Sequence, residues 1–263
     1  MAQQAGDVEQ VDRSIAGGAV RLLRGHVRPF EQARRRSLRR AADGHPNGKS
    51  DVLGGAAPGG LRSLIEKRLA LPLPGLLGLA FQAFNSVPAT RPVPDELAEF
   101  LYERLRGHVR EQGYTANQVE AVLVQRPQRI DLVPDQLAAV KAFESLPEAA
   151  ALSAANKRIV NILRKSGGEA AASVDVERLT QGAEGDLWHS FQTLAPEVDG
   201  HCARGDYTSA LKARASAKPA VDRFFDEVMV MVGDAELREN RLALLNRVAA
   251  TMNRVADISK LAA

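Results

Sequence analysis

The carboxyl-terminal stretch 218–261, KPAVDRFFDEVMVMVGDAELRENRLALLNRVAATMNRVADISKL, decides the fold of this chain. Pro219 suits the first position of a helix, where its missing N–H costs nothing. Apolar residues then recur at three- and four-residue steps up to Val232, so that one face of a helix is apolar. Gly233 is expected to stop this helix and Asp234 to cap the next one. The stretch therefore predicts two helices joined by a tight turn.

The second of these helices carries an apolar stripe of its own. The residues of the stripe are Leu237, Leu244, Leu245, Val248, Met252, Val255 and Ile258. The arginines that fall largely off the stripe are Arg238, Arg241, Arg247 and Arg254. We therefore expect an apolar helical hairpin with arginines on its rim.

Length and composition narrow the class of protein. A chain of 263 residues holds one or two domains, and abundant alanine and leucine with only 5% aromatic residues favour helix over sheet. The single cysteine, Cys202, excludes an internal disulfide and a thiolate metal cluster. No apolar run approaches the roughly 20 residues of a membrane span, and the N-terminus lacks the apolar core of a signal peptide. We expect a cytoplasmic chain without a membrane segment.

Positive charge is concentrated near the N-terminus. Residues 1–60 hold ten lysines and arginines against six acids, whereas the rest of the chain holds 25 against 26. The overall charge of +3 is therefore no argument for nucleic-acid binding, and an RNA site after residue 60 must be a local patch. The arginines at 34–36 and 39–40 fit an RNA-binding arm, but they fit a solvated, poorly ordered tail as well.

Other helices are expected where periodic apolar residues lie between start and stop signals. Thr115 and Gln118 form a T-x-x-Q capping box, which predicts a helix that begins there. The remaining predicted helices are 62–69, 76–84, 95–112, 134–146, 148–165, 182–202 and 207–217. No strand pattern and no repeat is found. The predicted fold class is all-α, with a helical lobe at 61–166, a carboxyl-terminal bundle at 167–263 and a hinge at 167–180.

Four segments resemble the β subunit of bacterial tetrameric glycyl-tRNA synthetase. The family patterns PVDxFFDxVMVM, LRxNRLxLL and RVADxSxL match 219–231, 237–245 and 254–261, and ANKRxxNIL matches ANKRIVNIL at 155–163. The resemblance covers about residues 61–263. It implies that the bundle at 167–263 is an anticodon-binding domain of the DALR type.

The resemblance also implies a binding role without chemistry. In that family an α2β2 heterotetramer uses ATP and Mg, and the α subunit activates glycine and joins it to tRNA. The expected partners are thus glycine tRNA and the α subunit. No catalytic residue, cofactor or metal is expected in this chain, because its five histidines lack metal-binding spacing and no phosphate-binding glycine motif occurs. The alternative is a non-catalytic helical protein-interaction module or an inert truncated remnant.

The first 60 residues depart from the family. Where the β subunit has DPFALRRAALGVLR, this chain has DVLGGAAPGGLR at 51–62. We therefore expect a truncated or frame-disrupted chain, with residues 1 to about 60 translated from another frame. Resequencing the gene tests this, because an intact upstream frame without a shift would contradict it.

Two groups of polar residues are candidates for tRNA contact. The candidates are Asn156, Lys157, Arg158 and Asn161 on one predicted helix, and Arg238, Asn240 and Arg241 on another. Cations bind phosphates, and a guanidinium can stack on an unpaired base and hydrogen-bond its edge. Structural roles remain open alternatives. Arg164 and Lys165 complement a helix dipole. Arg241 can pair within the chain, either with the acids close to it in the sequence or, if the hairpin closes, with those of the preceding helix: Asp234, Glu236 and Glu239, or Asp222 and Asp226.

Overall fold

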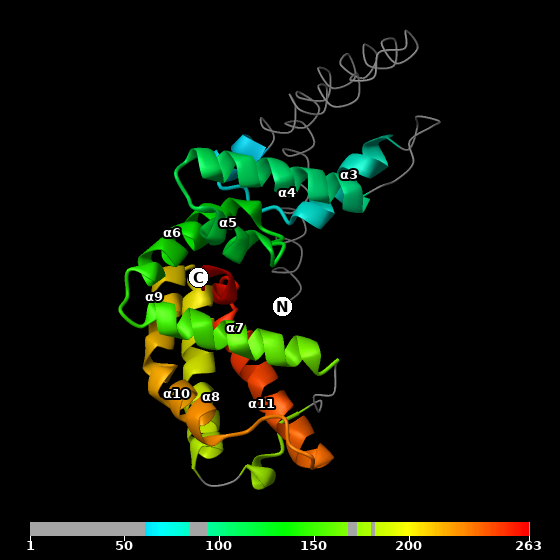
Figure 1. The fold of residues 1–263 in the computed structure, drawn as a ribbon. Helices are drawn as coiled ribbons and strands as arrows, with labels where there is room; N and C mark the ends of the chain where they lie inside the picture. Colours follow the sequence, from blue (N-terminus) through cyan, green and yellow to red (C-terminus); the bar gives the residue numbers. More distant parts are fainter. Residues whose placement is uncertain (1–60, 85–93, 168–172, 180–181, 263) are drawn as a thin grey trace, which may run out of the picture. The chain divides into compact units, whose positions relative to one another are not determined.

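The computed structural model describes residues 61–84, 94–167, 173–179 and 182–262 (Figure 1). The predicted all-α class is confirmed: across these ranges every regular element is a helix, and β-pairing is limited to an isolated bridge between Pro72 and Arg129. The predictions for residues 1–60 lie outside the described part. None of the described helices is long and apolar enough to cross a membrane.

Contacts between residues divide the chain into two units. Among the described residues, one unit takes in those up to 111 together with 128–132, and the other takes in 112–127 together with those from 133 onward. The boundary that we predicted between 166 and 167 does not coincide with this division. The reason is that the helix preceding this boundary packs on the carboxyl-terminal helices and so belongs with them.

In the described part of the first unit, residues 61–66 are helical and two longer helices pack on each other. Its labelled elements are α3 (Leu73–Phe84), α4 (Pro94–Glu111) and the 3₁₀ turn η1 (Ile130–Leu132). The N–H of Leu73 donates to the carbonyl of Gln128 over 2.7 Å, which ties the start of α3 to the segment before η1. Arg129 then forms a two-pronged ion pair with the buried Asp131, at 2.8 and 2.7 Å.

The second unit contains the remaining elements. They are α5 (Ala116–Leu123), α6 (Val133–Glu144), α7 (Ala149–Lys165), η2 (Val176–Arg178), α8 (Ala183–Ala203), α9 (Tyr207–Ala213), η3 (Arg214–Ala217), α10 (Lys218–Glu227), α11 (Ala235–Met252) and η4 (Ile258–Leu261). The predicted capping box is present, since Thr115 and Gln118 exchange both of its hydrogen bonds. Asp206 and Asp234 cap α9 and α11 with their side chains. Local signals therefore set these helix starts.

Helix α8 forms the centre of the second unit. Helices α9, α10 and α11 pack against it, and α11 also contacts α7 (Figure 1). Its predicted stripe is buried at Leu187, Phe191, Leu194 and Val198, and burying one such side chain contributes about 1.5–3 kcal/mol. The chain then folds back on itself, because η4 packs against α5 and α7.

The carboxyl-terminal stretch is not the tight helical hairpin that we predicted. Helix α10 ends at Glu227, and residues 228–233 are not helical. Their side chains alternate: Val230 is 6% exposed, whereas Met229 and Met231 are 72% and 52% exposed. β-branched residues at every second position favour an extended backbone, so the helix stops before Gly233. Helix α10 packs chiefly on α8.

Helix α11 is also shorter than predicted. It ends at Met252, and residues 253–257 form an irregular turn before η4. Val255 and Ile258 are nevertheless buried, as the stripe required. The N–H of Asp257 donates to the carbonyl of Ala121 over 2.7 Å, so contact with α5 replaces the continued helix.

Candidate nucleic-acid interface

The carboxyl-terminal half of α7 gathers positive charge. Helix α7 contains no aspartate or glutamate, and we call its four cations the α7 basic face: Lys157, Arg158, Arg164 and Lys165. All four residues are exposed. The first two are adjacent and so are the last two, seven residues further on, so the four lie within about two turns of one helix. Because residues 61–263 hold nearly equal numbers of acids and bases, this is the kind of local patch that a phosphate backbone requires.

The contacts of this face leave the side chains at the surface. Lys157 donates from Nζ to the carbonyl of Ala262 over 3.3 Å, and Arg164 donates to Oδ1 of Asn161 over 3.2 Å. Both hydrogen bonds are exposed to solvent. Exposed hydrogen bonds of this kind exchange readily with water or with phosphate oxygens. The face can therefore bind an anion without unfolding its surroundings.

Asn156 lies away from this face, although we predicted it as a tRNA contact. Its side chain is fully buried, and its Nδ2 donates to Oδ1 of Asn253 over 2.8 Å. In this conformation the residue joins α7 to the end of α11. The sequence carried a signal for this role, since Asn156 lies four residues after Leu152 and three before Ile159, both of which are buried.

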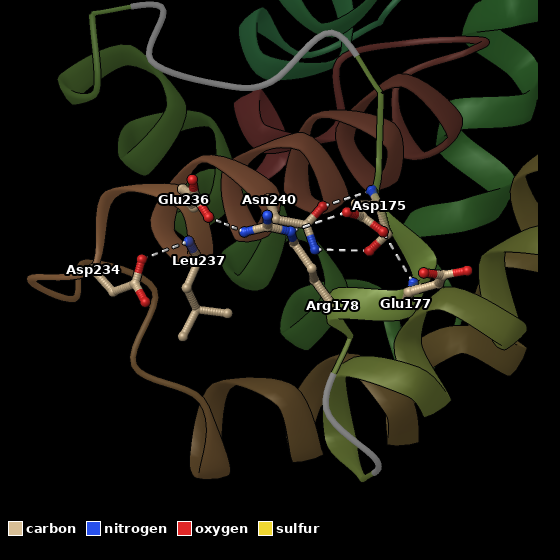
Figure 2. A network of polar contacts seen from close by, with 7 residues as sticks. All are labelled: Asp175, Glu177, Arg178, Asp234, Glu236, Leu237 and Asn240. Atoms are coloured by element: carbon tan, nitrogen blue, oxygen red, sulfur yellow. Dashed lines mark hydrogen bonds and ion pairs between the residues drawn. The ribbon is translucent and has the colours of Figure 1, made fainter.

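Asn240 is likewise a structural residue and not a surface contact. It is 3% exposed, and its side-chain amide accepts from the N–H of Asp175 at 2.8 Å and donates to the same residue's carbonyl at 2.9 Å (Figure 2). Arg178 adds ion pairs to Asp175 and Glu236. The described part of the predicted hinge, 173–179, is thus fastened to α11.

The Asn240→Ala substitution is expected to lower the free energy of unfolding by about 1–3 kcal/mol, because it leaves the backbone groups of Asp175 without their partners. Urea denaturation followed by circular dichroism measures the change. Arg178→Ala is the matched control on the same contact, and a much smaller effect is expected because its ion pairs are exposed. Equal losses in the two variants would contradict the assignment.

Arg238 and Arg241 support the non-helical segment 228–233. Arg241 donates from Nη1 to the carbonyl of Met229 over 2.8 Å, and Arg238 donates to that of Val232 over 3.0 Å. The Nε of Arg241 also pairs with Glu184, whose side chain is 1% exposed. Of the two roles left open for Arg241, intrachain pairing is the one observed. Its partner lies on α8 and not among the acids nearby in the sequence.

Arg214 is a buried cation that the sequence did not reveal. Its guanidinium donates to the carbonyl of Thr251 at 3.2 and 3.1 Å and also to that of Ala210. Burial lowers the pKa of Arg214 to about 10, so that the group remains charged at neutral pH. Thr251 lies in the last turn of α11, where the helix dipole favours a cation.

Part of the second unit is similar to a known domain family. Residues 152–261 match the family model of the DALR anticodon binding domain. The match begins within α7 and ends with η4, so it includes the α7 basic face. Residues 152–261 are therefore similar to the DALR anticodon binding domain family.

Whole proteins similar to this chain make the resemblance more specific. The chain is 51% identical over 220 residues to the glycine–tRNA ligase β subunit of Thiobacillus denitrificans and 50% identical over 220 residues to that of Ralstonia nicotianae. Each match covers 83% of this chain and 31% of the relative. The predicted resemblance is confirmed, and the chain spans about a third of the length of these relatives.

Proposed function

We propose that this chain binds glycine tRNA through the α7 basic face, as the anticodon-binding part of a glycine–tRNA ligase β subunit. The observation that carries the proposal is a helix with four exposed cations and no acid, inside the range that matches the anticodon binding domain. Release of counterions from the RNA supplies affinity, and unpaired bases supply specificity.

In the whole ligase this chain contributes binding and no catalytic group. The α subunit carries the site that uses ATP and Mg to join glycine to tRNA, in an α2β2 assembly. Contacts with the anticodon arm orient the acceptor end of the tRNA toward that site. The proposed compartment is the cytoplasm.

Burial and intrachain contacts lead us to revise the membership of the proposed site. Lys157, Arg158 and Asn161 stay in it, and Arg164 and Lys165 join them because they are exposed on the same helix. The residues withdrawn from it are Asn156, Asn240 and Arg241, whose side chains are held by intrachain contacts. Arg238 stays a candidate outside the α7 basic face.

Titration of labelled glycine tRNA with the full chain tests the proposal. The combined variant Lys157→Ala, Arg164→Ala, Lys165→Ala is expected to bind more weakly. Its plot of log affinity against log salt, between about 50 and 200 mM, should also be shallower by about 2–3, because each lost phosphate contact removes about 0.7–0.9 from the slope. Fluorescence anisotropy gives both quantities.

The control variant is Lys212→Ala, which removes an exposed cation from α9 in the same unit. Residues 1–60 are present in every variant, so their contribution cancels in the comparison. Equal affinity and equal salt slope for the triple variant and this control would overturn the proposal. Substituting the anticodon bases of the tRNA should weaken binding to the unmodified chain.

A protein-interaction module is the second candidate, and the exposed Met229 and Met231 favour it. Exposed methionines adapt to varied apolar partner surfaces. In that case the affinity for tRNA would be low and uniform among tRNAs. Binding of the unmodified chain to the α subunit would change little with salt, and the double variant Met229→Ser, Met231→Ser would abolish this binding.

A further inference from the structure

Arg158 differs from the other cations of the α7 basic face, because an aromatic ring lies beside its guanidinium. The guanidinium carbon is 4.1 Å from the centroid of the Phe225 ring, a residue of α10. This is a stacking distance for an arginine on an aromatic face. Arg158 is exposed all the same, so the contact does not bury its charge.

The ring beneath Arg158 is itself held in place. Phe225 is half-buried and meets Phe224 edge to face, with ring centroids 5.5 Å apart and an angle of 76° between the planes. Phe224 is fully buried and anchors the pair in the core. Helix α10 also packs on α7. The position of the guanidinium is therefore fixed before any ligand arrives, which reduces the entropy lost on binding.

We propose that Arg158, held against Phe225, is a stacking platform for an unpaired base of the tRNA, whereas the other three cations of the face contact phosphates. The inference rests on the proposed function and divides the work within that site. Phe225 can cover only one face of the planar guanidinium, and a base takes the other. Base stacking on such platforms tolerates any base, because every base has a π-face.

The structure moves this stacking role away from the residues for which we first considered it. Arg238 and Arg241 both donate hydrogen bonds to backbone carbonyls of the segment 228–233. Arg158 has no ion pair or hydrogen bond within the described ranges, and its contact is with a ring. Its guanidinium thus keeps all of its donors available for the edge or the phosphate of the nucleotide that it stacks on.

Two RNA hairpins separate stacking from charge. The first has the sequence of the anticodon arm of glycine tRNA, and the second has the same backbone with abasic sites in the loop, so that it keeps its phosphates. Arg158→Lys keeps the charge but loses the plane. It is expected to bind the intact hairpin about tenfold more weakly than the unmodified chain does. Its affinity for the abasic hairpin and its salt slope should not change.

Two further variants complete the experiment. Phe225→Leu removes the ring under the guanidinium and should reproduce the pattern of Arg158→Lys. Arg247→Lys makes the same chemical change at an exposed position of α11 outside the α7 basic face and should bind both hairpins like the unmodified chain. Thermal denaturation monitors folding, and if Phe225→Leu unfolds the chain, the exposed Arg158→Lys decides the question alone.

The outcomes distinguish this inference from the proposed function. If Arg158→Lys binds the intact hairpin as tightly as the unmodified chain does, or loses the same affinity for both hairpins, the inference of a stacking platform is wrong. The phosphate-binding role of α7 then still stands. If the triple alanine variant of Lys157, Arg164 and Lys165 also binds normally, the proposed function falls with it.

Discussion

Replacing Arg214 with alanine is expected to lower the free energy of unfolding by about 3–5 kcal/mol. The substitution removes a fully buried side chain and leaves the carbonyls of Thr251 and Ala210 without the donors that the guanidinium supplies. The carbonyl of Thr251 also accepts from the N–H of Arg254, but over a long 3.4 Å, so the guanidinium supplies its shorter hydrogen bonds. Because whole domains are stable by only about 5–15 kcal/mol, urea denaturation should show a large shift of the midpoint.

Two companion variants test the physical reason for this loss. Lys212→Ala, at an exposed position of α9, should leave the midpoint unchanged. Arg214→Met fills most of the volume without the charge, so it should cost less than alanine. A midpoint for Arg214→Ala close to that of Lys212→Ala would show that the buried hydrogen bonds contribute little.

The pH dependence of Arg214 has a definite sign. Burial lowers its pKa from the ordinary arginine value to about 10. Below pH 10 the group is charged in both states, and burying the charge lowers stability by a constant amount. Above about pH 10 the folded chain releases the proton while the unfolded chain, with its ordinary arginine pKa, still retains it, so this contribution to stability rises with pH. Over this pH range the free energy of unfolding of the unmodified chain should therefore rise relative to that of Arg214→Met.

The helix bounds could be predicted largely because their causes are local. The capping box at Thr115 and Gln118, and the stripe from Leu187 to Val198, are short-range patterns that the structure reproduces. The prediction of a helix at 228–233 was wrong, because the valines of this segment fit both a helical step and an alternating strand pattern. Donors on α11 then satisfy carbonyls of this segment, and no local pattern announces them.

The candidate site could be predicted only in part, because residue type does not determine exposure. Lys157 and Arg158 lie on the surface as expected, whereas Asn156 and Asn240 occupy stripe positions and are buried. Their spacing from neighbouring leucines was a usable signal. Arg214 gave none, since its main acceptor is 37 residues away in the chain.

The Arg241→Ala substitution is the second change with a large expected effect, a loss of about 3–5 kcal/mol in the free energy of unfolding. Arg241 pairs with Glu184, whose side chain is 1% exposed and lies in the first turn of α8. The substitution removes the cation that pairs with this buried carboxylate and the donor to the carbonyl of Met229. Urea denaturation measures the loss, and Arg254→Ala, which breaks an exposed pair with Asp199, is the matched control.

A double variant decides whether the pairing itself causes this loss. In Arg241→Met with Glu184→Leu no charge remains to be buried, and replacing a buried ion pair by apolar side chains of similar volume is often neutral or stabilising. The double variant should therefore be more stable than Arg241→Ala, with non-additive effects of the two positions. Additive losses would mean that Arg241 acts mainly through the carbonyl of Met229. Under conditions in which the double variant is folded, its affinity for tRNA should equal that of the unmodified chain, because Arg241 stabilises the fold and lies outside the α7 basic face.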